Sequence, residues 1–77
     1  MEERLLEIAS EEATEFNISP EDFIELCKIG CRIIFKDDLN KRINLFGGVE
    51  FPKENLREFL LVCANGGALS KLSSGKS

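Results

Sequence analysis

The hydrophobic positions at the start of the chain recur every three or four residues, which is the period of an α-helix. The apolar side chains on this face are Leu5, Ile8, Ala9, Ala13 and Phe16. Glutamates occupy the opposite face, and acidic residues crowd the first turn, where they complement the positive end of the helix dipole. The pattern therefore predicts an amphipathic helix over residues 2–16, which Asn17 can end in a left-handed conformation.

A second helix start follows directly. Ser19 is a good N-cap, Pro20 suits the first helical position, and Asp22 is an acid three residues after the cap. The helix is predicted to run to residue 35, with an apolar face made of Phe23, Leu26, Cys27, Gly30, Ile33 and Ile34. Glycine costs a helix interior roughly 1 kcal/mol relative to alanine. We therefore expect Gly30 to mark a close approach between two helices.

The middle of the chain fits two structures. As a helix, it is capped by Asp37 or Asp38 and ends at Gly47, which supplies a left-handed stop. Its apolar face is then Leu39, Ile43 and Phe46. As a hairpin, residues 43–51 alternate around the Gly47-Gly48 turn. Strands of three or four residues are weak and an isolated hairpin is marginal in water, so we favour the helix.

A last helix begins at Pro52 and is predicted to end at Asn65-Gly66-Gly67. Its apolar face consists of Leu56, Phe59, Leu60 and Cys63. The whole pattern predicts a mainly α fold, a compact small helical bundle of three longer helices plus one short helix. The alternative is an α+β fold with a small hairpin around 43–51. We expect residues 1–72 to form a single domain and residues 73–77 a flexible C-terminal tail.

The length and composition support one small globular domain. The chain has 77 residues, of which 43% are hydrophobic, and this apolar content is enough to oppose the entropy cost of ordering. The N-terminus lacks the pattern of a signal peptide, and no segment approaches the roughly 20 apolar residues that span a membrane. Three cysteines are too few for a disulfide scaffold. We therefore expect a cytoplasmic protein with no membrane contact.

The side chains that carry most catalytic and metal chemistry are scarce. The chain contains no histidine, which removes the usual general base near neutral pH. Cys27, Cys31 and Cys63 could in principle bind a metal or react as thiols, but a closed zinc site needs four ligands. Buried cysteine behaves as a small hydrophobe, so we expect all three to pack in the core. We predict a non-enzymatic protein with no catalytic residue, metal site or cofactor.

The charge of −4 is unevenly distributed along the chain. Residues 1–25 contain nine acidic residues and one arginine, whereas residues 26–46 contain five basic and two acidic residues. Two surfaces follow from this distribution. The acidic face of the first helix consists of Glu3, Glu7, Glu11, Glu12 and Glu15. The basic row consists of Lys28, Arg32, Lys36, Lys41 and Arg42.

These surfaces lead to two functional hypotheses. The first is a protein-interaction or regulatory module, such as an inhibitor, adaptor or small subunit, that binds another protein through the acidic face. A core this small is also compatible with a homodimer, and the sequence does not decide the oligomeric state. The second hypothesis is a nucleic-acid-binding regulator that uses the basic row to contact phosphates. The negative net charge opposes the second hypothesis.

Overall fold

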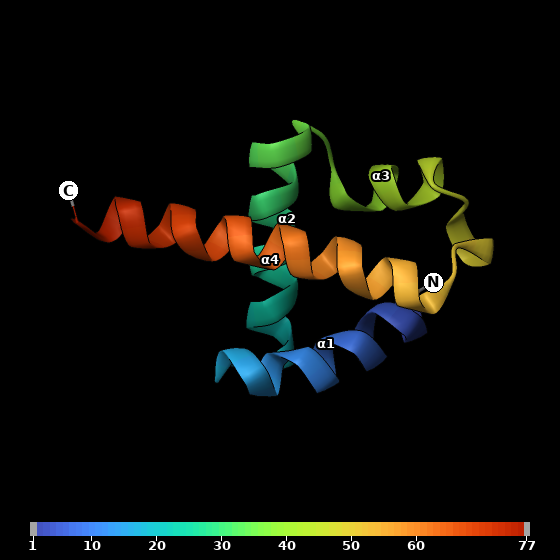
Figure 1. Cartoon of the computed structure of the whole chain (residues 1–77), viewed down its shortest axis with the longest axis horizontal. Coiled ribbons are helices and arrows are strands. Elements are labelled where there is room, and N and C mark those ends of the chain that lie inside the picture. Colours follow the sequence, from blue (N-terminus) through green and yellow to red (C-terminus); the bar gives the residue numbers. More distant parts are fainter. Residues whose placement is uncertain (1, 77) are drawn as a thin grey trace.

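The computed structural model describes the backbone of residues 2–76 and the side chains of residues 3–48 and 50–70 (Figure 1). The elements in chain order are α1 (Glu2–Phe16), α2 (Pro20–Phe35), α3 (Leu39–Leu45), a short 3-10 helix η1 (Gly48–Glu50) and α4 (Lys53–Lys76). No strand occurs within this described part of the chain. The mainly α fold of three longer helices and one short helix is therefore confirmed, and the hairpin around 43–51 is not.

The boundary between α1 and α2 forms as the local sequence predicts. Asn17 has φ of 59°, a left-handed conformation that reverses the chain after α1. The Ser19 hydroxyl oxygen accepts a hydrogen bond from the Asp22 amide at 3.2 Å, and Pro20 occupies the first helical position. This cap satisfies one of the amides that a helix start leaves without an intrahelical partner.

The middle segment forms a helix because its start and stop signals agree. The Asp38 carboxylate accepts a hydrogen bond from the Lys41 amide at 3.3 Å and caps α3. Leu39 and Ile43 are buried against the core, and Gly47 follows with φ of 130°. A side chain at this φ is strained, so glycine is the residue that allows the chain to turn toward η1.

Helices α2 and α4 cross at the centre of the molecule, and α1 and α3 pack near opposite ends of α2 (Figure 1). The crossing is made by glycines. A Cβ atom on Gly30 would lie 1.6 Å from the Cys63 carbonyl oxygen, and one on Gly67 would lie 2.2 Å from the Leu26 carbonyl oxygen. The two backbones are therefore in direct contact, which confirms the close approach expected at Gly30.

The prediction that the last helix ends at Asn65-Gly66-Gly67 is wrong, because α4 continues to Lys76. Gly67 lies inside the helix, where its missing side chain allows the contact with α2. The packing at the crossing compensates for the low helix propensity of the two glycines. The backbone of residues 73–76 belongs to α4, and Ser77 lies outside the described residues. The domain boundary at residue 72 and the flexible tail stay predictions.

The core consists of aliphatic, phenylalanine and cysteine side chains packed between the four helices. Its largest fully buried members are Phe23, Ile8, Ile43, Leu56, Leu60, Cys27, Cys31 and Cys63. Buried polar or charged residues are absent from the part of the chain whose side chains are described. Within the described residues, none of the helices combines the length and apolar character that a membrane crossing requires.

Candidate interaction surfaces

The acidic face of α1 is partly neutralised by the first turns of α4. Lys53 forms an ion pair with Glu7, and Arg57 forms ion pairs with Glu11 and, at 3.2 Å, with Glu12. The hydrogen bond and positive charge of Lys53 lower the pKa of Glu7. These pairs attach α1 to α4, so part of the predicted partner-binding surface serves a structural contact.

Two carboxylates of the acidic face point to solvent without an ion pair to a described side chain. Glu3 and Glu15 are exposed, and neither forms an ion pair among the side chains that the structure describes. The pairing of Lys53 and Arg57 with α1 was not foreseen from the sequence. It depends on the start of α4 lying beside α1, and no local pattern in either segment indicates that contact.

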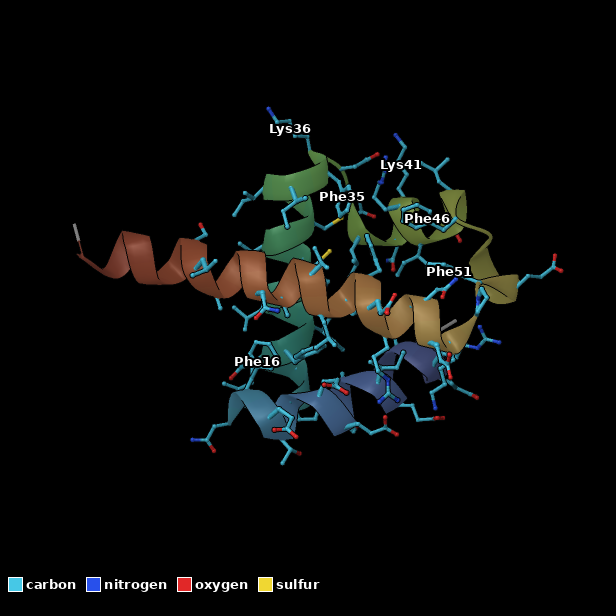
Figure 2. The ribbon with its side chains drawn as sticks, in the orientation of Figure 1. Phe16, Phe35, Lys36, Lys41, Phe46 and Phe51 are labelled. Atoms are coloured by element: carbon cyan, nitrogen blue, oxygen red, sulfur yellow. The ribbon has the colours of Figure 1, made fainter. Side chains whose placement is uncertain are left out.

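The basic row is divided among three environments. Lys28 pairs with Glu25 and Lys41 pairs with Asp37, both at 3.8 Å. Arg32 and Lys36 are exposed, with no ion pair among the described side chains. Figure 2 shows Lys36 and Lys41 extending away from the body of the molecule. Exposed pairs of this kind contribute little energy, but each places an acid beside the lysine, so Arg32 and Lys36 carry the remaining positive charge in the last part of α2.

Arg42, the last member of the row, is held by aromatic rings. Its guanidinium carbon lies 5.1 Å from the centre of the Phe35 ring and 5.5 Å from that of Phe46. Figure 2 shows Phe35, Phe46 and Phe51 gathered around α3 and the start of α4. Cation–π contacts of this length stabilise the position of the guanidinium. Arg42 therefore fastens α3 to the end of α2 and contributes less to a free basic surface.

The charge is separated in space as well as in sequence. The first turn of α2 carries Glu21 and Asp22 and lies near α1, whereas its last turn carries Arg32 and lies near α3 (Figure 1). The axis of α2 thus connects an acidic end of the molecule with a basic end. Both charges also complement the dipole of α2.

The three cysteines lie together inside the α2–α4 crossing. Each is fully buried, and the Cys27 thiol donates a hydrogen bond to the Leu60 carbonyl oxygen at 3.3 Å. Burial raises the pKa of all three thiols, that of Cys63 to about 12. Neutral, inaccessible thiols are poor nucleophiles and poor metal ligands. The packing role expected for the cysteines is confirmed.

Exposed apolar side chains lie on α2 and α4 within a few residues of the point where the two helices cross. We name this set the apolar strip, and its members are Ile33, Ile34, Val62 and Leu69, which are 44–66% exposed. Ile34 lies directly over Gly66, which joins the two helices into one surface. Val62, Gly66 and Leu69 share a face of α4 by their spacing.

The sequence placed Ile33 and Ile34 on the buried face of α2, and the structure corrects this. Both residues follow the crossing point at Gly30, where α4 covers that face only in part: Ile34 lies over Gly66 and still remains 44% exposed. The helical period identified the correct face of α2, but it could not indicate how far along the helix the covering element extends.

A groove lies between α1, α2 and α3, on the side of α2 that faces away from α4. We name it the α1–α2–α3 groove. One part, of about 250 Å³, is lined by Leu5, Leu6, Ile24, Lys28, Leu39 and Asn40. A second part, of about 260 Å³, is lined by Glu25, Lys28, Ile29, Arg32, Asp38 and Leu39. The two parts are contiguous because Lys28 and Leu39 line both.

Comparison of the chain with protein-family models, with curated protein sequences and with solved structures gave no match. The function is therefore argued from the geometry of these surfaces. The surfaces available are an acidic face tied in part to α4, a divided basic row, an apolar strip and a shallow groove.

Proposed function

We propose that the chain is a non-enzymatic protein-interaction module, and that the apolar strip forms the centre of its binding surface for another protein. The observation that carries the proposal is the exposure of four large apolar side chains near the α2–α4 crossing. Exposed apolar side chains that form one surface are typical of binding sites, whereas single ones are ordinary.

The charges around the molecule support a protein partner with a positive surface. The net charge is −4, and the acidic end formed by α1 and the start of α2 gives the molecule a negative field on one side. Such a field increases the rate of encounter with a basic partner and contributes less to affinity. In this proposal the exposed glutamates guide the partner, and the apolar strip supplies the buried contact.

The nucleic-acid hypothesis has less support from the geometry. Of the basic row, Lys28 and Lys41 are paired with acids and Arg42 is stacked on phenylalanine rings. Arg32 and Lys36 would then have to provide most of the phosphate contacts against a negative net charge. Electrostatic binding of nucleic acid weakens when few phosphates are neutralised.

The proposal is tested by affinity capture of the tagged chain from native lysate, with and without nuclease, comparing the wild type with Leu69→Glu. Leu69 is 66% exposed, so a charge at this position leaves the fold intact. We expect a defined protein partner that resists nuclease and is lost in the variant. Recovery of nucleic acid that disappears at high salt would instead favour the basic row.

The matched control is Leu45→Glu, because Leu45 is also an exposed leucine, 64% accessible, but belongs to α3. We expect this variant to retain the partner. Loss of the partner in both variants, or in neither, would contradict a site at the apolar strip.

A second experiment, Glu15→Lys, tests whether the acidic charge guides the partner. We expect slower association and a nearly unchanged dissociation rate. Glu15 suits this test because its exposed carboxylate supports no described ion pair to α4.

A further inference from the structure

Helix α4 has one face whose described side chains are exposed to solvent from its first turn to beyond the crossing with α2. The members of this outer face are Glu54, Glu58, Val62, Asn65 and Leu69. From Glu58 to Leu69 the steps are four, three and four residues, which is the spacing by which two helices pair along a common seam. Figure 1 shows the C-terminal half of α4 projecting past α2. A short helix is marginal in water without packing, so this half gains most from a second helix along it.

The two halves of α4 differ in charge. In the first half, Glu54 and Glu58 are exposed and form no ion pair with a described side chain. Lys53 and Arg57 line a shallow depression with them, but these two cations pair with three glutamates of α1, so this end of the molecule remains acidic. The sequence after Gly67 contains two lysines and no acidic residue. One half of α4 is therefore acidic and the other is basic.

We propose that the protein bound at the apolar strip is a second copy of this chain, whose α4 lies antiparallel to the first along the outer face. The inference rests on the proposed function, because Val62 and Leu69 belong both to the apolar strip and to the outer face. These two residues are equally far along the helix from the midpoint between Asn65 and Gly66. A two-fold axis at this midpoint places Val62 of each copy opposite Leu69 of the other.

The same axis brings opposite charges together. In this register Glu58 of one copy lies within two residues of Lys71 of the other, and Glu54 lies within one residue of Lys76. A uniformly basic partner would meet the lysines and a uniformly acidic one would meet the glutamates, whereas a second copy meets an opposite charge at both ends. Antiparallel pairing also sets the two helix dipoles in opposition. Closed two-fold contacts are the commonest form of self-association.

The first test is the molecular mass of the chain across a concentration series, measured by sedimentation equilibrium. The series extends to about 1 mM, because a contact of one helix per copy is small and therefore weak. We expect a dimer for the wild type, and a Kd raised at least roughly tenfold for Leu69→Glu. The matched control is Leu45→Glu on α3, since Leu45 is 64% and Leu69 66% exposed. A wild type that stays monomeric throughout would overturn the proposal, and so would equal weakening by the two substitutions.

The second test uses charge reversal. Glu54→Lys with Glu58→Lys makes both halves of α4 basic, and Lys71→Glu with Lys76→Glu makes both halves acidic. Each double variant alone is expected to be monomeric, because like charges then meet at both ends of the pair. An equimolar mixture of the two is expected to form a heterodimer. A mixture that remains monomeric would contradict the antiparallel pairing.

The control for charge reversal is Glu21→Lys with Glu25→Lys. Both residues are exposed on α2, in its first turn and one turn later, which matches the places of Glu54 and Glu58 in α4. This variant should stay dimeric. Circular dichroism of all the variants verifies that the helices are intact, so that loss of the dimer reports on the outer face.

The dimer and the proposed function can fail separately. If the dimer forms as described, the tagged chain should recover untagged copies of itself when the two are mixed, and Leu69→Glu should lose them. If the purified chain is monomeric and affinity capture instead recovers a different protein that Leu69→Glu loses, the dimer is overturned and the proposed function stands.

Discussion

At the scale of single residues, adjacent glycines in α4 have different roles. A Cβ atom added at Gly67 would collide with the Leu26 backbone, which cannot move without displacing α2. A Cβ atom added at Gly66 would instead contact the end of the Ile34 side chain. Ile34 is 44% exposed, so its side chain can rotate away. The closeness of the α2–α4 crossing therefore depends on Gly67 and Gly30, and much less on Gly66.

This difference predicts the effect of two neighbouring substitutions. Gly67→Ala should lower the free energy of unfolding by about 2 kcal/mol or more, because the added methyl group forces the helices apart. Gly66→Ala should be close to neutral, because a gain of up to about 1 kcal/mol in helix propensity offsets the movement of Ile34. Urea denaturation followed by circular dichroism measures both. Equal effects at the two positions would show that the crossing is looser than described.

At the scale of elements, each helix start is produced by a few local contacts. The Ser19 cap and Pro20 define the start of α2, and the Asp38 cap defines the start of α3. The ends are less local. The left-handed Lys36 after α2 carries no special sequence signal, and α4 passes through Gly66-Gly67 because tertiary packing holds it there.

The N-cap of α2 can be tested alone. Ser19→Ala should lower the free energy of unfolding by about 1 kcal/mol, because the Asp22 amide loses its acceptor. Ser19→Asp should retain most of the stability, since aspartate is an equally good cap. Ser10→Ala, at an exposed position inside α1, is the control and should be neutral or slightly stabilising. If the Ser19 and Ser10 variants unfold at the same urea concentration, the cap has no energetic role.

At the scale of the whole molecule, two long helices joined at a glycine crossing create a thin, flat structure. The small core contains three thiols from both helices, and the remaining apolar side chains are left on the faces. A domain of this size buries only about 60% of its unfolded surface. Its stability is therefore sensitive to any change that charges a core group.

The buried thiols predict a loss of stability at alkaline pH. The pKa of Cys63 is about 12 in the folded chain, against an ordinary value near 9, so the unfolded chain releases its proton first. The contribution of the protonated Cys63 thiol to the free energy of unfolding is therefore fully present below about pH 9. It decreases as the pH rises toward 12, because the unfolded state then binds fewer protons than the folded state. Urea midpoints across this range measure the decrease. Cys63→Ala should show a shallower dependence on pH, whatever its stability at pH 7. Parallel curves would argue against a buried, protonated thiol.

The sequence by itself determined the features that depend on neighbours along the chain. The helical period placed Ile8, Phe23 and Leu60 on buried faces, and the capping residues located the helix starts. The hydrophobic behaviour of free cysteine indicated the burial of the three thiols, and the cost of glycine inside a helix indicated a close contact at Gly30. These features are local because a helix forms its hydrogen bonds within a few residues.

Only the tertiary structure decided which faces stay covered and which charges meet. Lys53 and Arg57 neutralise the acidic face because α4 begins beside α1, and no sequence pattern encodes that distance. Ile34 is 44% exposed because α4 covers its side chain only at Gly66, although its helical position is apolar. Gly66 and Gly67, a stop signal in isolation, lie within a helix since contact with α2 outweighs their low propensity. Each of these outcomes depends on the contact between two elements distant in sequence, and folding alone establishes such contacts.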